Sequence, residues 1–505
     1  MPNRALPAVL CCAVLSAPLL GAASDWRQKV DPWVLETSSA TAETEFLVVL
    51  ASQADVSGAR ELATKEEKGR YVSETLRATA AATQGPLLAR LDALGVPHRA
   101  YWIVNMIWAR GDQGLVQELA RRADVARIHA NPWVAADIPT GSTPAPATPE
   151  AIEGGVQQIN APEYWSHGFT GQGAVVAGAD TGYDWDHPAL IAHYRGWNGA
   201  AANHNYNWHD SIHSGGGSCG FDSTQPCDDS GHGTHTMGTM VGDDGGSNQI
   251  GVAPGARWIG CRNMNVGAGT PTTYSECFQW FIAPTDLSGG NPDPSKAPDV
   301  INNSWSCPVS EGCTDPNVLK TVVENTRAAG IVVVVSAGNS GSACSTVNTP
   351  AAIYEASLSV GATDSGDNIA GFSSRGPVTV DGSNRLKPNV SAPGVNVRSS
   401  LPGGGYGSLS GTSMAGPHVV GQVALLISAE PALAGDVDTI QACIEGTAVP
   451  RTTSQNCGGV PGSEVPNNTY GFGRVELVWP PPCSDQLFDD GFESGDTSAW
   501  TTTAL

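Results

Sequence analysis

The sequence has few charged residues, and basic residues are the scarcest of them. Only 15% of the 505 residues are charged, with 26 Lys and Arg against 49 Asp and Glu, so the formal net charge is −23. Residues 1–137 hold 14 basic and 15 acidic residues, which leaves 12 basic and 34 acidic residues for 138–505. A strongly acidic surface repels a phosphate backbone, so we expect no nucleic-acid partner and interpret the charge as favouring solubility.

Long apolar runs are also lacking, except at the N-terminus. There, MPNRALPAVLCCAVLSAPLLGAAS places one Arg before an apolar run from Ala5 to Leu20 and ends in small residues. This pattern predicts a secretory signal peptide over residues 1–23, and hence an exported, secreted protein of bacterial type. No later segment has the roughly 20 apolar residues that a membrane-spanning helix needs, so we expect no membrane span.

Cysteine is absent from residues 24–137, whereas residues 138–505 have ten cysteines, and Cys11 and Cys12 lie in the predicted signal peptide. An even number in an exported protein predicts disulfides, and the spacings lack the CxxC pairs of zinc sites. Pairing cysteines that are close in sequence gives 219–227, 261–277, 307–313 and 443–457, and leaves 344 and 483 over. Sequence alone does not fix this connectivity.

Composition divides the chain into several parts, because 505 residues exceed one ordinary core. Residues 24–137 alternate between apolar strand patterns at 45–50, 99–109 and 125–134 and helical patterns at 58–84 and 113–122, which predicts a small α+β domain of order β-α-β-α-β. Residues 138–153 are rich in Pro, Thr and Ala and are typical of an exposed linker and processing region. A Pro-rich linker and a short acidic tail form 477–505, too small for a core of their own.

Residues 154–476 carry a different pattern. Continuous apolar runs at 173–180, 298–305, 330–339 and 355–363 alternate with helical segments such as 316–329. Strands that are apolar on both faces are typical of parallel sheets, so we predict a doubly wound α/β domain flanked by helices. In such sheets, ligands and catalytic groups gather at the carboxyl ends of the strands.

Three polar residues stand where such elements begin or end. Asp180 ends the first apolar run, His232 lies between glycines in GHGTHT, and Ser413 begins a helical segment in GTSMAGPHV. Taken singly, each has a plain alternative, since Asp180 and Ser413 could be helix caps and His232 with His235 a weak metal pair.

Taken together, the three residue types supply nucleophilic catalysis. A serine hydroxyl needs a neutral imidazole to accept its proton, and the imidazole needs a carboxylate to fix its tautomer. A helix start adds unpaired N–H groups that favour negative charge. Asn339, after the apolar run IVVVVSAG, adds a side-chain donor for an oxyanion, although Asn is also a common turn residue.

The segments GADTGYD, GHGTHTMGT, SAGNSG and GTSMAGPHV, in this order, resemble those of the subtilisin-like serine proteases, peptidase family S8. The form NNSW with nearby cysteines resembles the bacillopeptidase F branch. The resemblance implies an endopeptidase with Asp180 orienting the imidazole, His232 as general base, Ser413 as nucleophile and Asn339 in the oxyanion hole. It implies substrate binding at Ser304, Trp305, Ser306 and Gly338.

The resemblance further implies that residues 24–137 are an inhibitory propeptide, cut off between about residues 138 and 153. The expected partners are therefore protein or peptide substrates and the chain's own propeptide, and we expect a monomer. The chemistry needs no cofactor. Ala189 stands where subtilisins have a calcium-binding aspartate, so support for a structural calcium ion is weak. The tail LFDDGFESGDTSAW resembles C-terminal sorting or processing tags of exported bacterial proteins.

Two other classes of protein remain as alternatives. A catalytically inactive, subtilase-like binding protein would not need the complete set of catalytic residues. An esterase or lipase of the α/β-hydrolase type would need its nucleophile in a GxSxG segment and the chain order Ser, acid, His, whereas Ser413 lies in GTSMAG and the order here is Asp180, His232, Ser413.

Overall fold

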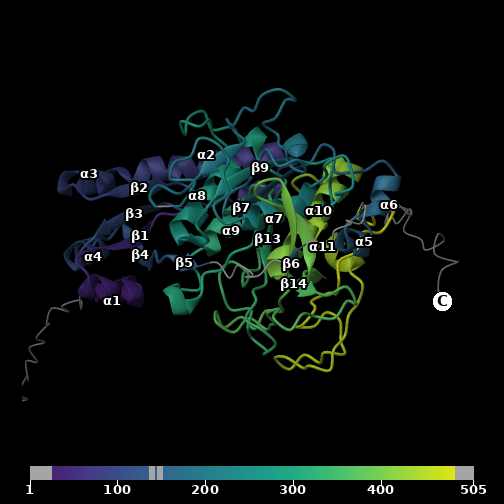
Figure 1. Ribbon diagram of the computed structural model, residues 1–505. Helices are drawn as coiled ribbons and strands as arrows, with labels where there is room; N and C mark the ends of the chain where they lie inside the picture. The colour runs from purple at the N-terminus through teal and green to yellow at the C-terminus, as the bar shows by residue number, and fades with distance from the viewer. Residues whose placement is uncertain (1–24, 136–142, 145–151, 216, 484–505) are drawn as a thin grey trace, which may run out of the picture.

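The computed structural model describes residues 25–135, 143–144, 152–215 and 217–483. These residues form an N-terminal unit, residues 25–135, and a larger C-terminal unit, residues 152–483, that lie side by side (Figure 1). The predicted signal peptide, most of the linker and the acidic tail from residue 484 lie outside the described residues. No helix in the described part of the chain is both long and apolar enough to cross a membrane.

The N-terminal unit is a four-stranded antiparallel sheet of order β2-β3-β1-β4 with four α-helices. Its strands are β1 (Thr44–Leu50), β2 (His98–Tyr101), β3 (Met106–Gly111) and β4 (Val125–Ala130). Its helices are α1 (Pro32–Ala40), α2 (Lys65–Thr83), α3 (Gly85–Leu94) and α4 (Gln113–Ala120).

Alternation along β1 gives this sheet two different faces. Phe46 and Val48 point into a core shared with α1, α3 and α4, whereas Leu47 joins the core that contains α8 (Pro271–Ile282) and α9 (Lys320–Ala328) of the C-terminal unit. Because successive side chains of a strand point to opposite faces, one strand serves both cores.

Two predictions for this unit need correction. Residues 99–109 are not one strand but parts of β2 and β3, joined by a turn at residues 102–105, and α1 and α3 were not foreseen. The turn is fixed from outside, since the backbone N–H groups of Trp102 and Ile103 donate to Oε1 of Gln279 on α8, at 2.7 and 3.1 Å. The helix predicted at 58–84 begins at Lys65, where Thr64 and Glu67 form a capping box.

The C-terminal unit confirms the predicted doubly wound α/β fold. Its main sheet has seven parallel strands in the order β15-β14-β13-β12-β7-β9-β8. The strands are β7 (Val175–Asp180), β8 (Trp208–Asp210), β9 (Arg257–Arg262), β12 (Val300–Asn303), β13 (Val332–Ser336), β14 (Leu358–Thr363) and β15 (Val390–Pro393). Further helices are α5 (Gly154–Gln158), α6 (Ala161–Ser166), α7 (His232–Val241), α10 (Thr412–Ala429) and α11 (Val437–Thr447).

Helices cover this sheet on both faces. Along β13, Val332 and Val334 join the core that contains α7 and α10, whereas Val333 and Val335 join the core that contains α8 and α9. Each fully buried valine contributes about 1.5–3 kcal/mol relative to an exposed one, which explains the unbroken run of valines.

Two small antiparallel sheets attach segments near the predicted linker. In one, β5 (Val134–Ala135) pairs with β11 (Ala268–Gly269), which pairs with β10 (Met264–Asn265). In the other, β6 (Thr143–Pro144) pairs with β17 (Gly405–Leu409), which pairs with β16 (Val397–Leu401).

All ten cysteines of the C-terminal unit form disulfides. The pairs 219–227, 261–277 and 307–313 are those expected, but the expected pair 443–457 is wrong, because the bonds are Cys344–Cys457 and Cys443–Cys483. The fold brings these cysteines together across 113 and 40 positions of the chain, so nearness in sequence was a poor guide.

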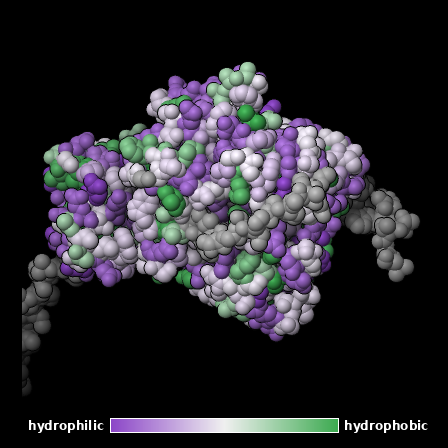
Figure 2. Space-filling model, in the orientation of Figure 1, coloured by the Kyte–Doolittle hydropathy of each residue, from purple (hydrophilic) through white to green (hydrophobic). Residues whose placement is uncertain are grey.

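The surface has no dominant apolar area on the face shown in Figure 2, where hydrophobic residues lie in small groups among hydrophilic ones. Scattered exposed apolar side chains are normal for a globular protein and need no partner to explain them.

Candidate active site

Two of the predicted catalytic residues are in direct contact. Asp180 is the last residue of β7, His232 is the first residue of α7, and Oδ1 of Asp180 lies 2.7 Å from Nδ1 of His232. Both side chains are fully buried. The carboxylate also accepts the N–H of Thr181 at 2.8 Å and the hydroxyl of Thr236 at 3.3 Å, so its direction is fixed.

The environment of His232 suits it to accept a proton. Burial alone would lower the pKa of the imidazole, but the attraction and the hydrogen bond of Asp180 outweigh burial, so the pKa is raised from its ordinary value. The other ring nitrogen, Nε2, is buried and has no hydrogen-bond partner among the described residues.

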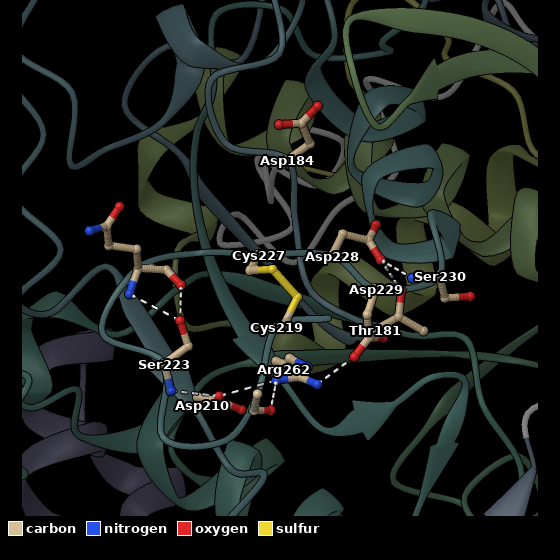
Figure 3. Close-up of a disulfide and its surroundings, with 12 residues drawn as sticks. Thr181, Asp184, Asp210, Cys219, Ser223, Cys227, Asp228, Asp229, Ser230 and Arg262 are labelled. Atoms are coloured by element: carbon tan, nitrogen blue, oxygen red, sulfur yellow. Dashed lines mark hydrogen bonds and ion pairs between the residues drawn. A yellow bond between two sulfur atoms is a disulfide. The ribbon is translucent and has the colours of Figure 1, made fainter. Parts of the chain in front are cut away.

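The start of α7 is held by Asp228, which sequence reasoning did not single out. Its carboxylate accepts the N–H groups of Ser230, Gly231 and Thr234 at 2.8–3.0 Å and the hydroxyl of Thr181 at 2.8 Å (Figure 3). These bonds satisfy helix-start N–H groups and tie the His232 loop to the end of β7. The motif DDSGHG could have indicated the role of Asp228, because an Asp shortly before a helix is a common helix cap.

A buried arginine also contacts the loop that precedes His232. Arg262, at the end of β9, forms ion pairs with Asp210 and with Asp229, and all three side chains are almost completely buried (Figure 3). The disulfide Cys219–Cys227 closes the loop that leads to Asp228. Nothing in the sequence around Arg262 predicted this contact, because its partners come from distant segments.

Ser413 is the second residue of α10, and Pro417 lies one turn further along the same helix. Pro417 has no N–H group, so the carbonyl oxygen of Ser413 lacks its helical partner. The hydroxyl of Ser304 donates to that oxygen at 3.3 Å. The helix therefore keeps its path while Ser304 is held beside Ser413.

The side chain of Asn339 is anchored at one end only. Its Oδ1 accepts both the N–H and the hydroxyl of Thr412, each at 2.9 Å. This contact orients the amide, and its Nδ2 donates no hydrogen bond to any residue that the structure describes. Asn339 thus presents a free, oriented N–H donor next to Ser413.

A cleft of about 640 Å³ contains most of the predicted site. Its lining includes Ser413, Asn339 and all the predicted substrate-binding residues, namely Ser304, Trp305, Ser306 and Gly338. Gly338 has φ +104°, a conformation that L-residues with a side chain rarely adopt. Trp305 is 3% exposed, and its ring stacks on Tyr274, with the ring centroids 3.9 Å apart.

Not all of the predicted catalytic residues are in hydrogen-bond contact with one another. Among the described residues, no hydrogen bond links the hydroxyl of Ser413 to Nε2 of His232. His235, the second histidine of the motif, lies at 3.1 and 3.2 Å from the carbonyl oxygens of Val397 and Gly407. Burial lowers its pKa to about 3, so it is a neutral structural residue.

Ala189, at the expected calcium position, does not fit a calcium ligand. Its side chain is fully buried and has no oxygen, and its N–H donates to Nδ1 of His187 at 3.0 Å. No group of three or more His, Cys, Asp or Glu side chains in the described part of the chain could hold a metal ion.

The unit combines a parallel sheet, a buried Asp–His pair, and a serine at a helix start beside an oriented amide. This arrangement is that of the subtilisin-like serine peptidases. The sequence model of the "Subtilase family" matches residues 171–473. The chain therefore belongs to the subtilase family, as its motifs predicted.

Individual relatives agree with this assignment. The chain is 34% identical to bacillopeptidase F of Bacillus subtilis (strain 168) over an alignment of 528 residues, which covers 94% of this chain but only 35% of that protein. It is 33% identical to subtilisin E of the same strain over 340 residues, covering 67% of this chain and 74% of the relative. It is 35% identical to subtilisin of Bacillus pumilus over 285 residues, covering 56% and 86%.

Proposed function

We propose that this chain is a secreted serine endopeptidase, made as a zymogen, that hydrolyses peptide bonds through an acyl-enzyme. Ser413 is the nucleophile, His232 the general base and then acid, and Asp180 the residue that orients the imidazole. The observation that carries the proposal is the buried 2.7 Å contact between Asp180 and His232, which leaves Nε2 without a partner.

The proposed reaction begins when the hydroxyl of Ser413 approaches Nε2 of His232 and attacks the carbonyl carbon of a bound peptide. His232 takes the hydroxyl proton, and Asp180 stabilises the imidazolium. The contact between hydroxyl and imidazole forms on substrate binding, since catalytic hydrogen bonds often tighten only in that complex.

Negative charge then develops on the carbonyl oxygen of the substrate. Nδ2 of Asn339 and the backbone N–H of Ser413, one of the orphan donors at the start of α10, stabilise this charge. His232 protonates the leaving amine, the peptide bond breaks, and water repeats the sequence of steps on the acyl-enzyme. No cofactor takes part.

The N-terminal unit is the proposed intramolecular inhibitor. Support comes from β5, which pairs with β11 of the C-terminal unit and brings Ala135 into the lining of the cleft that contains Ser413. A chain held there would block access of a substrate until it is cut. The proposed cut, between about residues 138 and 153, falls largely outside the described residues.

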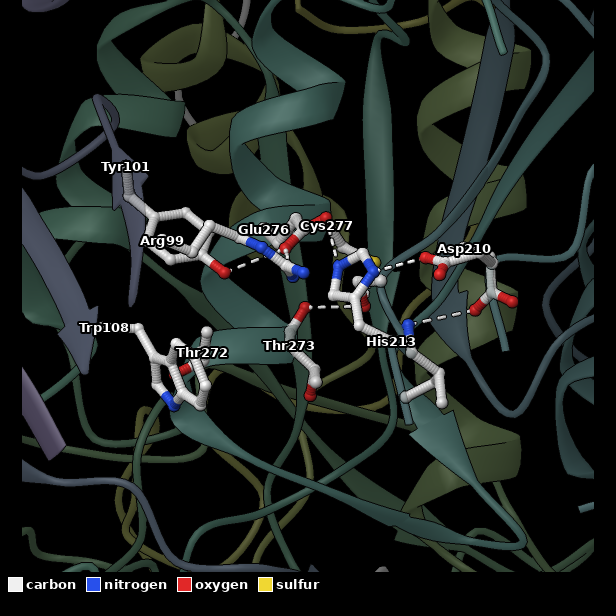
Figure 4. A network of polar contacts seen from close by, with 12 residues as sticks. Arg99, Tyr101, Trp108, Asp210, His213, Thr272, Thr273, Glu276 and Cys277 are labelled. Carbon is white, nitrogen blue, oxygen red and sulfur yellow. Dashed lines mark hydrogen bonds and ion pairs between the residues drawn. The ribbon is translucent and has the colours of Figure 1, made fainter. Parts of the chain in front are cut away.

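A polar network also joins the two units. Glu276 of α8 is 8% exposed, and its Oε2 accepts from Tyr101 at 2.9 Å and from Arg99 at 3.2 Å, both on β2 (Figure 4). Its Oε1 lies 3.0 Å from Nε2 of His209 and 2.9 Å from Nε2 of His213. The carboxylate thus receives partners from both units, as a specific docking contact requires.

Export and a monomeric state complete the proposal, with protein or peptide substrates as the partners. Five disulfides favour an oxidising compartment. The leader at 1–23 and the tail at 477–505 are the proposed sorting segments, although all of the leader and most of the tail lie outside the described residues.

A serine-reactive fluorophosphonate probe tests the catalytic role. We expect the active enzyme to be labelled at Ser413 and the Ser413→Ala variant to remain unlabelled. The matched control is Ser428→Ala, because Ser428 lies near the other end of the same helix and its hydroxyl has no partner among the described residues. An unlabelled wild-type protein would leave a binding function in place of catalysis.

A further inference from the structure

Among the described residues, Glu311 has the only ionisable side chain in the lining of the cleft. The other described lining residues are Ala, Ser, Trp, Pro, Val, Gly, Asn and Thr, none of which carries a charge. In a cleft of this kind, any charge preference for the substrate depends on one carboxylate.

Glu311 has a defined position. It ends a 3₁₀ turn (Val309–Glu311) inside the short loop closed by the disulfide Cys307–Cys313. Gly312, the next residue, has φ +106°, and an added Cβ there would collide with Trp33 and Pro132 of the N-terminal unit. The disulfide therefore restrains the loop, and the N-terminal unit packs closely on it.

The carboxylate faces a chain that lies in the cleft. Oε2 of Glu311 accepts the backbone N–H of Ala135 at 2.8 Å, and Ala135 belongs to the extended segment paired with β11. No Lys, Arg or His of the described residues forms an ion pair with Glu311.

The surroundings of Glu311 are partly shielded from water. Tyr274, which stacks on Trp305 in the cleft wall, has a raised pKa, chiefly because it is buried and secondly because the charge of Glu311 opposes its ionisation. The charge of Glu311 therefore acts beside a buried aromatic pair, where it is screened less than on an open surface.

We propose that Glu311 is a specificity-determining residue that favours Lys or Arg, and disfavours Asp or Glu, at one substrate position on the N-terminal side of the cleaved bond. The side follows from Ala135, which precedes the proposed processing region. A cation there gains attraction and an anion suffers repulsion, so both contribute to selection. This inference depends on the proposed peptidase function.

The test uses the active enzyme and quenched fluorescent peptides with Ala, Lys or Glu at each of the four positions before the cleaved bond. At one position we expect kcat/KM for Lys to exceed that for Glu by about 3- to 10-fold. Raising the salt from about 0.05 to 0.5 M should reduce this ratio, because salt screens charge pairs.

Two variants separate charge from hydrogen bonding. Glu311→Gln keeps an oxygen that can accept a backbone N–H but loses the charge, so the Lys to Glu ratio should fall to about one. Glu311→Lys should reverse the ratio. Glu464→Gln, at an exposed glutamate outside the cleft, is the matched control and should keep the wild-type ratio.

A wild-type ratio near one at all four positions would overturn the inference, as would an unchanged ratio in Glu311→Gln. The Ala peptides and fluorophosphonate labelling report separately on the peptidase function. If both show an active enzyme while the ratio stays near one, Glu311 is excluded as a determinant and the proposed function stands.

Discussion

The two units of the molecule bury their sheets in different ways. The parallel sheet of the C-terminal unit is covered on both faces by helices of the same unit, whereas the sheet of the N-terminal unit has one face in its own core and one against α8 and α9. The C-terminal unit has five disulfides, and the described part of the N-terminal unit contains no cysteine.

This difference indicates which unit depends on the other. The C-terminal unit has a core and covalent links of its own in addition to the core that it shares with the N-terminal unit. The N-terminal unit would expose Leu47 and its neighbours on the second sheet face if it were detached. A unit that loses part of its core on separation should be less stable when detached than when docked, which would suit the proposed temporary inhibitor.

The largest expected effect comes from removing the proposed nucleophile. Ser413→Ala should lower hydrolysis of casein by more than about 10⁴-fold, because the other catalytic residues cannot replace the hydroxyl. Gel electrophoresis of the secreted protein should show that the N-terminal unit remains covalently attached. Normal removal of that unit in this variant, in the absence of other proteases, would contradict self-processing.

Asp180 should set both the rate and the acid side of the pH profile. In the proposed mechanism, catalysis needs neutral His232, whose pKa is raised, so activity should fall as the pH drops through a value above the ordinary one. Asp180→Asn removes the attraction that raises this pKa, while burial, which lowers it, remains. We expect the acid limb to move to lower pH and kcat to fall by about 10⁴-fold. If the acid limb of the pH profile does not move in Asp180→Asn, Asp180 is excluded as the group that raises the pKa of His232.

Asn339→Ala should lower kcat by about 10²–10³-fold while KM and the melting temperature change little. That magnitude was established on an oxyanion-hole asparagine of this same family and is not a result of the distances reported above. Thr412→Ser, which keeps a hydroxyl and an N–H for Oδ1 of Asn339, is the control and should retain most of the activity. Equal losses in the two variants would point to a packing defect.

The sequence predicted the C-terminal unit better than the N-terminal one, for a physical reason. Runs such as VVVVS are apolar on both faces, so the parallel strands and the residues at their carboxyl ends could be located directly. In the N-terminal unit, the turn at residues 102–105 is held by Gln279 of another unit, which no local pattern contains.

Long-range partners explain the remaining misses in the site. The motifs predicted Asp180, His232, Asn339 and Ser413, because these residues stand at element ends in local sequence patterns. Arg262 contacts aspartates 33 and 52 positions away, and Glu276 contacts residues 63–177 positions away. Cys344 and Cys457 are likewise joined across 113 positions.

Removing a disulfide should have a smaller effect, on the stability of the C-terminal unit, which alone of the two described units contains disulfides. Replacing Cys344 and Cys457 by serine opens a link across 113 positions and should lower the unfolding free energy by about 4–5 kcal/mol in the chain-entropy treatment. Replacing Cys219 and Cys227, eight positions apart, should lower it by about 2–3 kcal/mol. Denaturant titration measures both, and the reverse order would show that strain or residual structure dominates.

The smallest expected effect concerns the contact between the units. Glu276→Gln removes the charge that faces Arg99 but keeps an oxygen for Tyr101, so the N-terminal unit should be held less tightly. Because the Arg99 side chain is 39% exposed, the coupling in a double-mutant cycle with Arg99→Gln should be about 1 kcal/mol or less. The readout is the rate at which activity appears after secretion, which should rise modestly in Glu276→Gln and stay unchanged in Glu464→Gln, an exposed glutamate of the C-terminal unit. A slower appearance of activity in Glu276→Gln would show that this network does not hold the inhibitor in place.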